Sequence, residues 1–150
     1  MAFKYSTGFK DAVLVTGSVR DVFNGGFIAV YEADSTPESA DDALPTEAVE
    51  LVRYSVGGDG TTGLTLSSTP DNGAVSKASG ETWQGTAAAT GTARFFRYER
   101  DDDTGDSSPT DIRIQGTVGG ADSDMFMTNT SFTVDETYTL DHFSIAVMGV

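Results

Sequence analysis

The sequence contains no cysteine, one histidine and only nine lysine and arginine residues among 150. Without cysteine the chain forms no disulfide bond and no thiolate metal site, a composition typical of folding in a reducing cytoplasm. The scarcity of basic residues argues against nucleic acid as a partner, because such binding depends on Lys and Arg contacts with phosphates. Anionic membrane surfaces are disfavoured as partners for the same reason.

Long apolar segments are also missing. No stretch of the sequence approaches the roughly 18–20 consecutive apolar residues of a membrane-spanning helix. The opening residues, Met1 to Ser6, lack the apolar segment of a secretory signal. We therefore expect a protein that is made in a cytoplasm and has no membrane partner.

Acidic residues and glycine are abundant. The chain has 23 Asp and Glu residues and 17 glycines, with a formal net charge of −14 at pH 7 and a pI of about 4.1. So much like charge opposes folding through self-repulsion, which salt screens over about 8–10 Å. This composition fits either a saline environment or an ordinary mesophilic acidic protein.

The first 26 residues favour short helices. Ser6 or Thr7 can cap a helix whose apolar residues, starting at Phe9, follow helical spacing. Ser18 followed by Asp21 is similar to a capping box, which predicts a second short helical turn. The glycines that follow Asn24 are suited to ending that turn.

From Phe27 onward, short β-type runs alternate with Gly- and Asp-rich turns. Pro70-Asp71-Asn72-Gly73 is typical of a hairpin with a type I′ turn. The pattern predicts an all-β fold, a β-sandwich or jelly-roll-like domain with a short N-terminal helix. We expect one domain over 1–150, with an arm of short helices at 1–26 and the sandwich at 27–150. The expected strands cover residues 27–31, 49–54, 64–66, 74–77, 93–98, 112–118, 125–127, 132–134 and 138–147, and residues 81–91 are expected to form a loop around the only tryptophan.

The densest acidic cluster runs from Asp101 to Asp106. Oxygen ligands at alternating positions suit Ca²⁺, which makes Asp101, Asp103 and Asp106 weak candidates for metal ligands. The spacing does not match an EF-hand loop, and no helices are predicted on either side. A solvated loop tip between two strands is the favoured interpretation.

Residue patterns of catalytic sites are missing from the sequence. His142 follows Asp141 within the predicted last strand, where adjacent side chains point to opposite faces, so Asp141 could not orient the imidazole. The sequence has no nucleophile elbow, zinc-protease motif or phosphate-binding loop. We therefore predict a protein that is not an enzyme and has no cofactor.

Four aromatic residues are candidates for contact with a partner. Phe3, Tyr5 and Phe9 precede the predicted sandwich, so they either contact a partner or pack on the chain's own sheet. Trp83 lies among small residues and either forms an exposed anchor, as tryptophan often does at interfaces, or closes one end of the sandwich.

Six segments together resemble a family of small tailed-bacteriophage virion proteins. The similarity covers most of the chain but is one of strands and turns, without a chemical motif. The acidic stretches at 34–47 and 99–111 depart from the family pattern. The segments run from Phe3 to Ala12, Asn24 to Tyr31, Ser76 to Trp83, Ala89 to Arg97, Arg113 to Gly119 and Leu140 to Ile145.

The resemblance implies a capsid decoration, or cement, protein. Such a protein binds the outside of the major capsid protein shell, often as a trimer, and stabilises it. The expected partners are the major capsid protein and further copies of this chain, with a trimer favoured. The expected location is the capsid surface of the virion, after synthesis in the bacterial host cytoplasm. The alternatives are a tail, baseplate or host-binding structural protein and, in a different class, a ligand-binding β-sandwich module.

Overall fold

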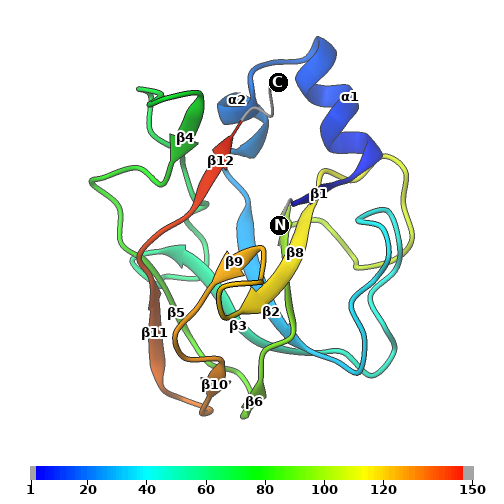
Figure 1. Cartoon of the computed structure of the whole chain (residues 1–150), viewed down its shortest axis with the longest axis vertical. Coiled ribbons are helices and arrows are strands. Elements are labelled where there is room, and N and C mark those ends of the chain that lie inside the picture. The colour runs from blue at the N-terminus through cyan, green and yellow to red at the C-terminus, as the bar shows by residue number, and fades with distance from the viewer. Residues whose placement is uncertain (1–2, 147–150) are drawn as a thin grey trace.

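The computed structural model describes residues 3–146 and is organised around an eight-stranded sheet (Figure 1). The strands follow the order β1-β8-β7-β2-β3-β5-β11 with antiparallel neighbours, and β9 adds to β8 in parallel. Two smaller pairs, β6 with β10 and β4 with β12, complete the strands, and the all-β prediction is confirmed. The bounds are β1 Lys4–Tyr5, β2 Phe27–Glu32, β3 Val49–Val56, β4 Ala74–Ser76, β5 Trp83–Thr86, β6 Gly91–Thr92, β7 Phe95–Glu99, β8 Ile114–Gly119, β9 Met125–Phe126, β10 Ser131–Phe132, β11 Thr137–Leu140 and β12 Ser144–Ala146.

The two helices begin where the sequence predicts. The Ser6 hydroxyl caps the first helix by accepting a hydrogen bond from the Phe9 N–H at 3.1 Å. Ser18 and Asp21 form the predicted capping box, with each side chain accepting from the other residue's N–H at 3.1 Å. Gly25 follows the second helix at a φ of +97°, a conformation that favours glycine. The helices are α1 Thr7–Val15 and α2 Val19–Phe23.

The N-terminal segment is part of the sheet and of the core. Lys4 and Tyr5 of β1 pair with Gln115 and Ile114 of β8, an arrangement that the sequence did not indicate. Phe9 of α1 is buried in the main hydrophobic core, together with two residues of α2. The segment expected to be an arm therefore contributes both a strand and core side chains.

One face of the large sheet is apolar. Strand side chains alternate between faces, so every second residue of β2, β3, β7 and β8 points the same way. Helices α1 and α2 and the β4–β12 pair add residues to this core. Phe23 of α2 stacks on Tyr98 with ring centroids 4.4 Å apart, and Phe143 stacks on Phe3 at 5.4 Å. The strand residues of this apolar face are Ile28, Val30, Val52, Tyr54, Phe96, Tyr98 and Ile114.

The opposite face of the sheet, called here the charged face, combines buried charged and polar residues with a small apolar cluster, and it is covered by two loops, 33–48 and 100–113. The loops lie side by side (Figure 1). Backbone hydrogen bonds join them: the Leu44 N–H donates to the Gly105 carbonyl at 2.8 Å, and the Ser108 N–H donates to the Asp41 carbonyl at 2.9 Å. Because both faces are covered, β7 is buried along its whole length. The residues of this charged face are Ala29, Tyr31, Arg53, Phe95, Arg97, Glu99 and Gln115.

The predicted strand over 138–147 is wrong as a single element. Strand β11 pairs with β5 in the large sheet, whereas β12 pairs with β4. Between them the chain crosses from one sheet to the other, and Phe143 turns into the core. Asp141 and His142 are exposed in this crossing and belong to no strand, so the prediction that they lie on opposite faces of one strand is wrong. Val147 lies outside the described residues.

Two predictions about the middle of the chain have opposite outcomes. The turn at Asn72 and Gly73 has φ values of 51° and 80°, which confirms the predicted type I′ turn. The loop expected over 81–91 is wrong, because Trp83 begins β5, whose residues pair with β3 and β11. The small residues that suggested a loop let this strand fit closely; a Cβ at Gly85 would lie 2.4 Å from the Arg53 carbonyl oxygen.

Candidate functional site

The acidic cluster contains a buried ion pair. The Arg113 guanidinium donates to both carboxylate oxygens of Asp103, at 2.7 and 2.8 Å, and the two side chains are 0% and 1% exposed. Asp103 is therefore not part of a solvated loop tip, and both of its oxygens are already engaged. Asp101 and Asp106 are exposed. Within residues 3–146, no group of three or more His, Cys, Asp or Glu residues could hold a metal ion.

Arg113 joins the two covering loops. Besides Asp103, its guanidinium donates to the carbonyls of Asp106 at 2.7 Å and Ala40 at 3.2 Å. Burial acts to raise the pKa of Asp103, but hydrogen bonds from Arg113 and from the Gly105 N–H outweigh it and hold that pKa below its ordinary value. The pair stays charged at neutral pH, and we interpret it as a structural anchor.

Trp83 is fully buried and belongs to the core. Its ring packs against Phe23 with centroids 6.1 Å apart, and its Nε1–H donates to a carboxylate oxygen of Glu81 at 2.8 Å. Of the two roles that the sequence allowed, the packing role is the one that the structure shows. The prediction of partner contact at Trp83 is corrected accordingly, because no part of the side chain is accessible.

The three N-terminal aromatic residues also pack on the chain's own core. Phe3 makes an edge contact with Phe96, with centroids 5.3 Å apart, and Phe9 is buried. Tyr5 stacks on Phe9 at 5.0 Å. Tyr5 and Phe9 differ from Phe3 in one respect, because both also line a surface groove.

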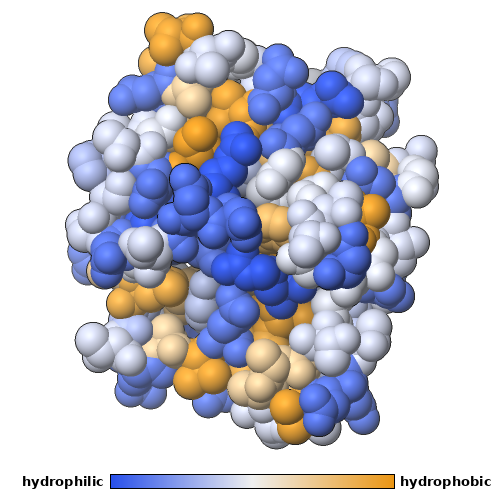
Figure 2. Space-filling model, turned by 180° about the vertical axis from the view of Figure 1, so that it is seen from behind, coloured by the Kyte–Doolittle hydropathy of each residue, from blue (hydrophilic) through white to orange (hydrophobic). Residues whose placement is uncertain are grey.

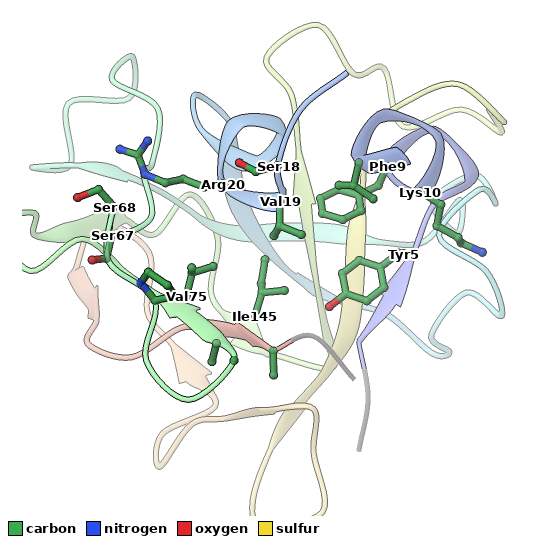
Figure 3. A pocket seen from close by; sticks show the side chains of 15 residues that line it. Tyr5, Phe9, Lys10, Ser18, Val19, Arg20, Ser67, Ser68, Val75 and Ile145 are labelled. Carbon is green, nitrogen blue, oxygen red and sulfur yellow. The ribbon is translucent and has the colours of Figure 1, made fainter. Parts of the chain in front are cut away.

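This groove lies between the two helices and the β4–β12 pair and has a volume of about 620 Å³ (Figure 3). Its lining is mainly apolar, with Phe9, Val13 and Val19 from the helices facing Val75 and Ile145 from the strands. Segments from both ends of the chain thus form its walls. It is larger than a second hollow with aromatic walls, which has a volume of about 260 Å³.

Two basic residues flank the groove. Figure 3 shows Lys10 of α1 on one side and Arg20 of α2 on the other. The Arg20 Nε–H donates to the Leu66 carbonyl at 3.0 Å, which holds one side of the guanidinium in place. Burial raises the pKa of Tyr5, so its hydroxyl keeps its proton and adds no negative charge. The groove thus has a cationic border on a strongly anionic protein.

Next to the groove, the last turn of α1 exposes two large apolar side chains. Leu14 is 78% and Val15 is 86% exposed. Figure 2, the view from behind, shows apolar atoms at the upper end of the molecule, over this end of the helix. Leu14 and Val15 were not among the contact residues predicted from the sequence. The available signal was a run of three apolar residues from Val13, which cannot all lie on one buried face of a helix.

Comparison with protein-family models, curated proteins and solved structures found no match to this chain. The likeness to phage virion proteins therefore rests on the segment pattern of the sequence. Of the helices in residues 3–146, none has the length and apolar character needed to cross a membrane.

Proposed function

We propose that this protein is an assembly protein that attaches to a larger protein surface through one docking face. The docking face consists of the groove together with Leu14 and Val15. The observation that carries the proposal is the exposure of these apolar side chains beside an apolar groove on a chain of net charge −14. Contiguous apolar surface that is rimmed by polar residues marks interaction sites in soluble proteins.

The charge distribution favours one orientation of this attachment. Lys10 and Arg20 border the groove, while the molecule as a whole carries a large negative charge. An acidic surface patch on the partner would be attracted to the groove and repelled elsewhere, which favours one orientation of docking. The docking face is thus suited to a partner with apolar residues flanked by carboxylates.

We further propose, from the resemblance, that this partner is the major capsid protein shell of a tailed bacteriophage. As a decoration protein, the chain would bind the assembled shell, with copies grouped as trimers. Binding only to the assembled state stabilises that state by linkage, and the stabilisation grows with the logarithm of the free concentration of the decoration protein relative to its Kd. A stable interface of this kind buries about 1,200–2,000 Å².

The first test is the copy number of the chain in purified virions, relative to the major capsid protein, measured by quantitative mass spectrometry. We expect a ratio near one, which would support binding across the capsid lattice. A few copies per particle would support the tail, baseplate or host-binding alternative instead. Absence of the chain from the particle would refute a virion role.

The second test concerns the docking face itself. We expect Leu14→Asp to reduce binding to undecorated capsids by at least tenfold, because it places a charge in a desolvated interface. Val134→Asp is the matched control, since Val134 is also exposed, at 43%, but does not line the groove. Equal binding by both variants would exclude this face as the attachment surface.

A ligand-binding module is the second candidate, and the size of the groove favours it. A volume of about 620 Å³ lies within the range of about 300–1,000 Å³ typical of small-molecule sites. The apolar lining would suit the hydrocarbon part of an amphiphile with an anionic head near Lys10 or Arg20. A rise in melting temperature with dodecanoate, abolished by Val19→Asp, would support this candidate, and an unchanged melting temperature would count against it.

A further inference from the structure

A second, smaller pocket lies on the apolar face of the sheet, at the β11 edge and away from the docking face. Its volume is about 260 Å³, close to the lower limit of about 300 Å³ for common ligand sites. Tyr54 of β3, Phe132 and Tyr138 contribute aromatic walls, and the crossing segment contributes Asp141 and His142. None of these residues lines the groove.

The pocket contains an unsatisfied buried hydroxyl. Tyr54 is 0% exposed, and its Oη has no hydrogen-bond partner among the described residues. Buried polar groups are nearly always paired, because an unpaired one loses its hydrogen bonds to water without replacement. By contrast, the buried hydroxyl of Tyr98 donates to the Phe23 carbonyl. The Tyr54 hydroxyl is thus an unused hydrogen-bonding group of a residue that lines the pocket.

The rim of the pocket combines an exposed aromatic ring with mixed polar groups. Phe126 is 64% exposed, although phenylalanine is usually buried. Asp141 supplies acceptor oxygens, while His142 and Asn129 supply side-chain nitrogens. The Asn129 oxygen already accepts from the Ser131 N–H at 3.0 Å, so the NH₂ group is the part of this side chain that can donate to a ligand.

The charges in and around the pocket disfavour anionic ligands. No Lys or Arg lines the pocket, Asp141 does, and the protein carries a net charge of −14, so an anionic ligand would be repelled. A ligand with several hydroxyl groups matches the mixture of donors and acceptors, and the C–H face of a sugar ring packs well on an aromatic ring. We propose that this pocket binds a neutral sugar residue, with Tyr54 and Asn129 as hydrogen-bonding groups and Phe126 as the stacking platform.

This sugar site is independent of the proposed attachment function, because the two surfaces share no residue. The test is a titration of the ¹⁵N-labelled full-length chain with a panel of neutral methyl glycosides, followed by two-dimensional NMR. We expect saturable shifts for at least one glycoside, confined to residues 126–142 and the centre of β3. Tetramethylammonium serves as a cationic probe of the same pocket.

Two variants and one control identify the site. We expect Phe126→Ala and Tyr54→Phe each to weaken glycoside binding about tenfold, the effect of losing one good hydrogen bond or stacking contact. Leu14→Ala, at an exposed position in the docking face, should bind as the wild type does; Leu14 is 78% exposed and Phe126 is 64% exposed. No saturable shift with any glycoside would overturn the proposal, as would shifts with tetramethylammonium alone. Unchanged binding by both pocket variants would also overturn it.

Discussion

The two faces of the large sheet are both buried and both pack apolar side chains, but within residues 3–146 only one of them buries charged side chains. The apolar face packs aromatic and branched side chains against the helices and the β4–β12 pair. The charged face buries Arg97, Glu99 and Gln115 beneath two loops. Hydrophobic packing is non-directional and tolerates substitution of similar volume, whereas a buried charge requires its specific partners. The positions of the two loops over the charged face are therefore constrained by specific partners, whereas the positions of the helices over the apolar face depend mainly on packing.

The buried polar side chains of the charged face are held in place by specific hydrogen bonds and ion pairs. Glu99 is buried and pairs with Arg53, and the Tyr31 hydroxyl donates to the same carboxylate at 3.0 Å. Arg97 donates from Nε and Nη2 to the side-chain oxygen of Gln115, at 3.1 and 2.6 Å. Burial and the nearby Arg113 guanidinium lower the pKa of Arg97. These groups form a polar layer that would be unstable if the loops were removed.

The largest effect is expected from breaking the buried Asp103–Arg113 ion pair in the loop that covers the charged face. Asp103→Ala should cost about 3–5 kcal/mol of unfolding free energy, because it removes the buried bidentate partner of the Arg113 guanidinium and leaves only the partly exposed Asp111 carboxylate, at 3.1 Å. Asp101→Ala is the matched control; Asp101 is exposed, and its loss should change stability by about 0.5 kcal/mol or less. Urea denaturation measures both. Equal stability of the two variants would show that the ion pair does not anchor the loops.

The corresponding substitution on the apolar face is Ile28→Ala. Removal of this fully buried side chain should cost about 2–5 kcal/mol, through lost burial and a residual cavity. Val49→Ala is the control, because Val49 is 43% exposed in a neighbouring strand. The Ile28 variant should keep the same pH dependence as the wild type. A changed pH dependence would contradict the separation of the two faces.

Acidification should distinguish the faces further. The pKa of Asp103 is lower in the folded state, so its stabilisation is present above the ordinary value of 3.8 and is lost as pH falls through the lower folded value. Burial raises the pKa of Glu99, which acts in the opposite direction: its favourable contribution is present at low pH and is lost as pH rises through the raised value.

The variant Asp103→Asn isolates the first of these two contributions. Urea midpoints measured from about pH 6 to about pH 3 should fall less steeply for this variant than for the wild type, because one proton-linked group has been removed. Asp101→Asn provides the reference slope at an exposed position. Parallel midpoint curves for the wild type and Asp103→Asn would mean that other carboxylates control the acid transition.

The smallest expected effect compares two buried hydroxyls on the apolar face. Tyr98→Phe should cost about 1 kcal/mol, because the Tyr98 hydroxyl donates to the Phe23 carbonyl. Tyr54→Phe should leave the melting temperature unchanged or raise it, since the Tyr54 hydroxyl has no partner among residues 3–146. A comparable loss in both variants would indicate that the Tyr54 hydroxyl is already paired, for instance with an ordered water.

The sequence alone determined the features that depend on neighbouring residues. The caps at Ser6 and Ser18 and the turn at Asn72-Gly73 follow from short-range hydrogen bonding and backbone preference, and all three are confirmed. The all-β class follows from the period-two pattern, which each strand carries within itself.

Tertiary structure alone decided the rest. The burial of Asp103 depends on Arg113, ten positions away, and on the Ala40 carbonyl in a different loop, so no local pattern marks Asp103 off from its exposed neighbour Asp101. The groove depends on bringing residues near the two ends of the chain together, and the split of the last predicted strand depends on which partner strands are available. Local sequence encodes backbone conformation and amphipathic pattern, whereas burial, ion pairing and surface shape are set by contacts between distant segments.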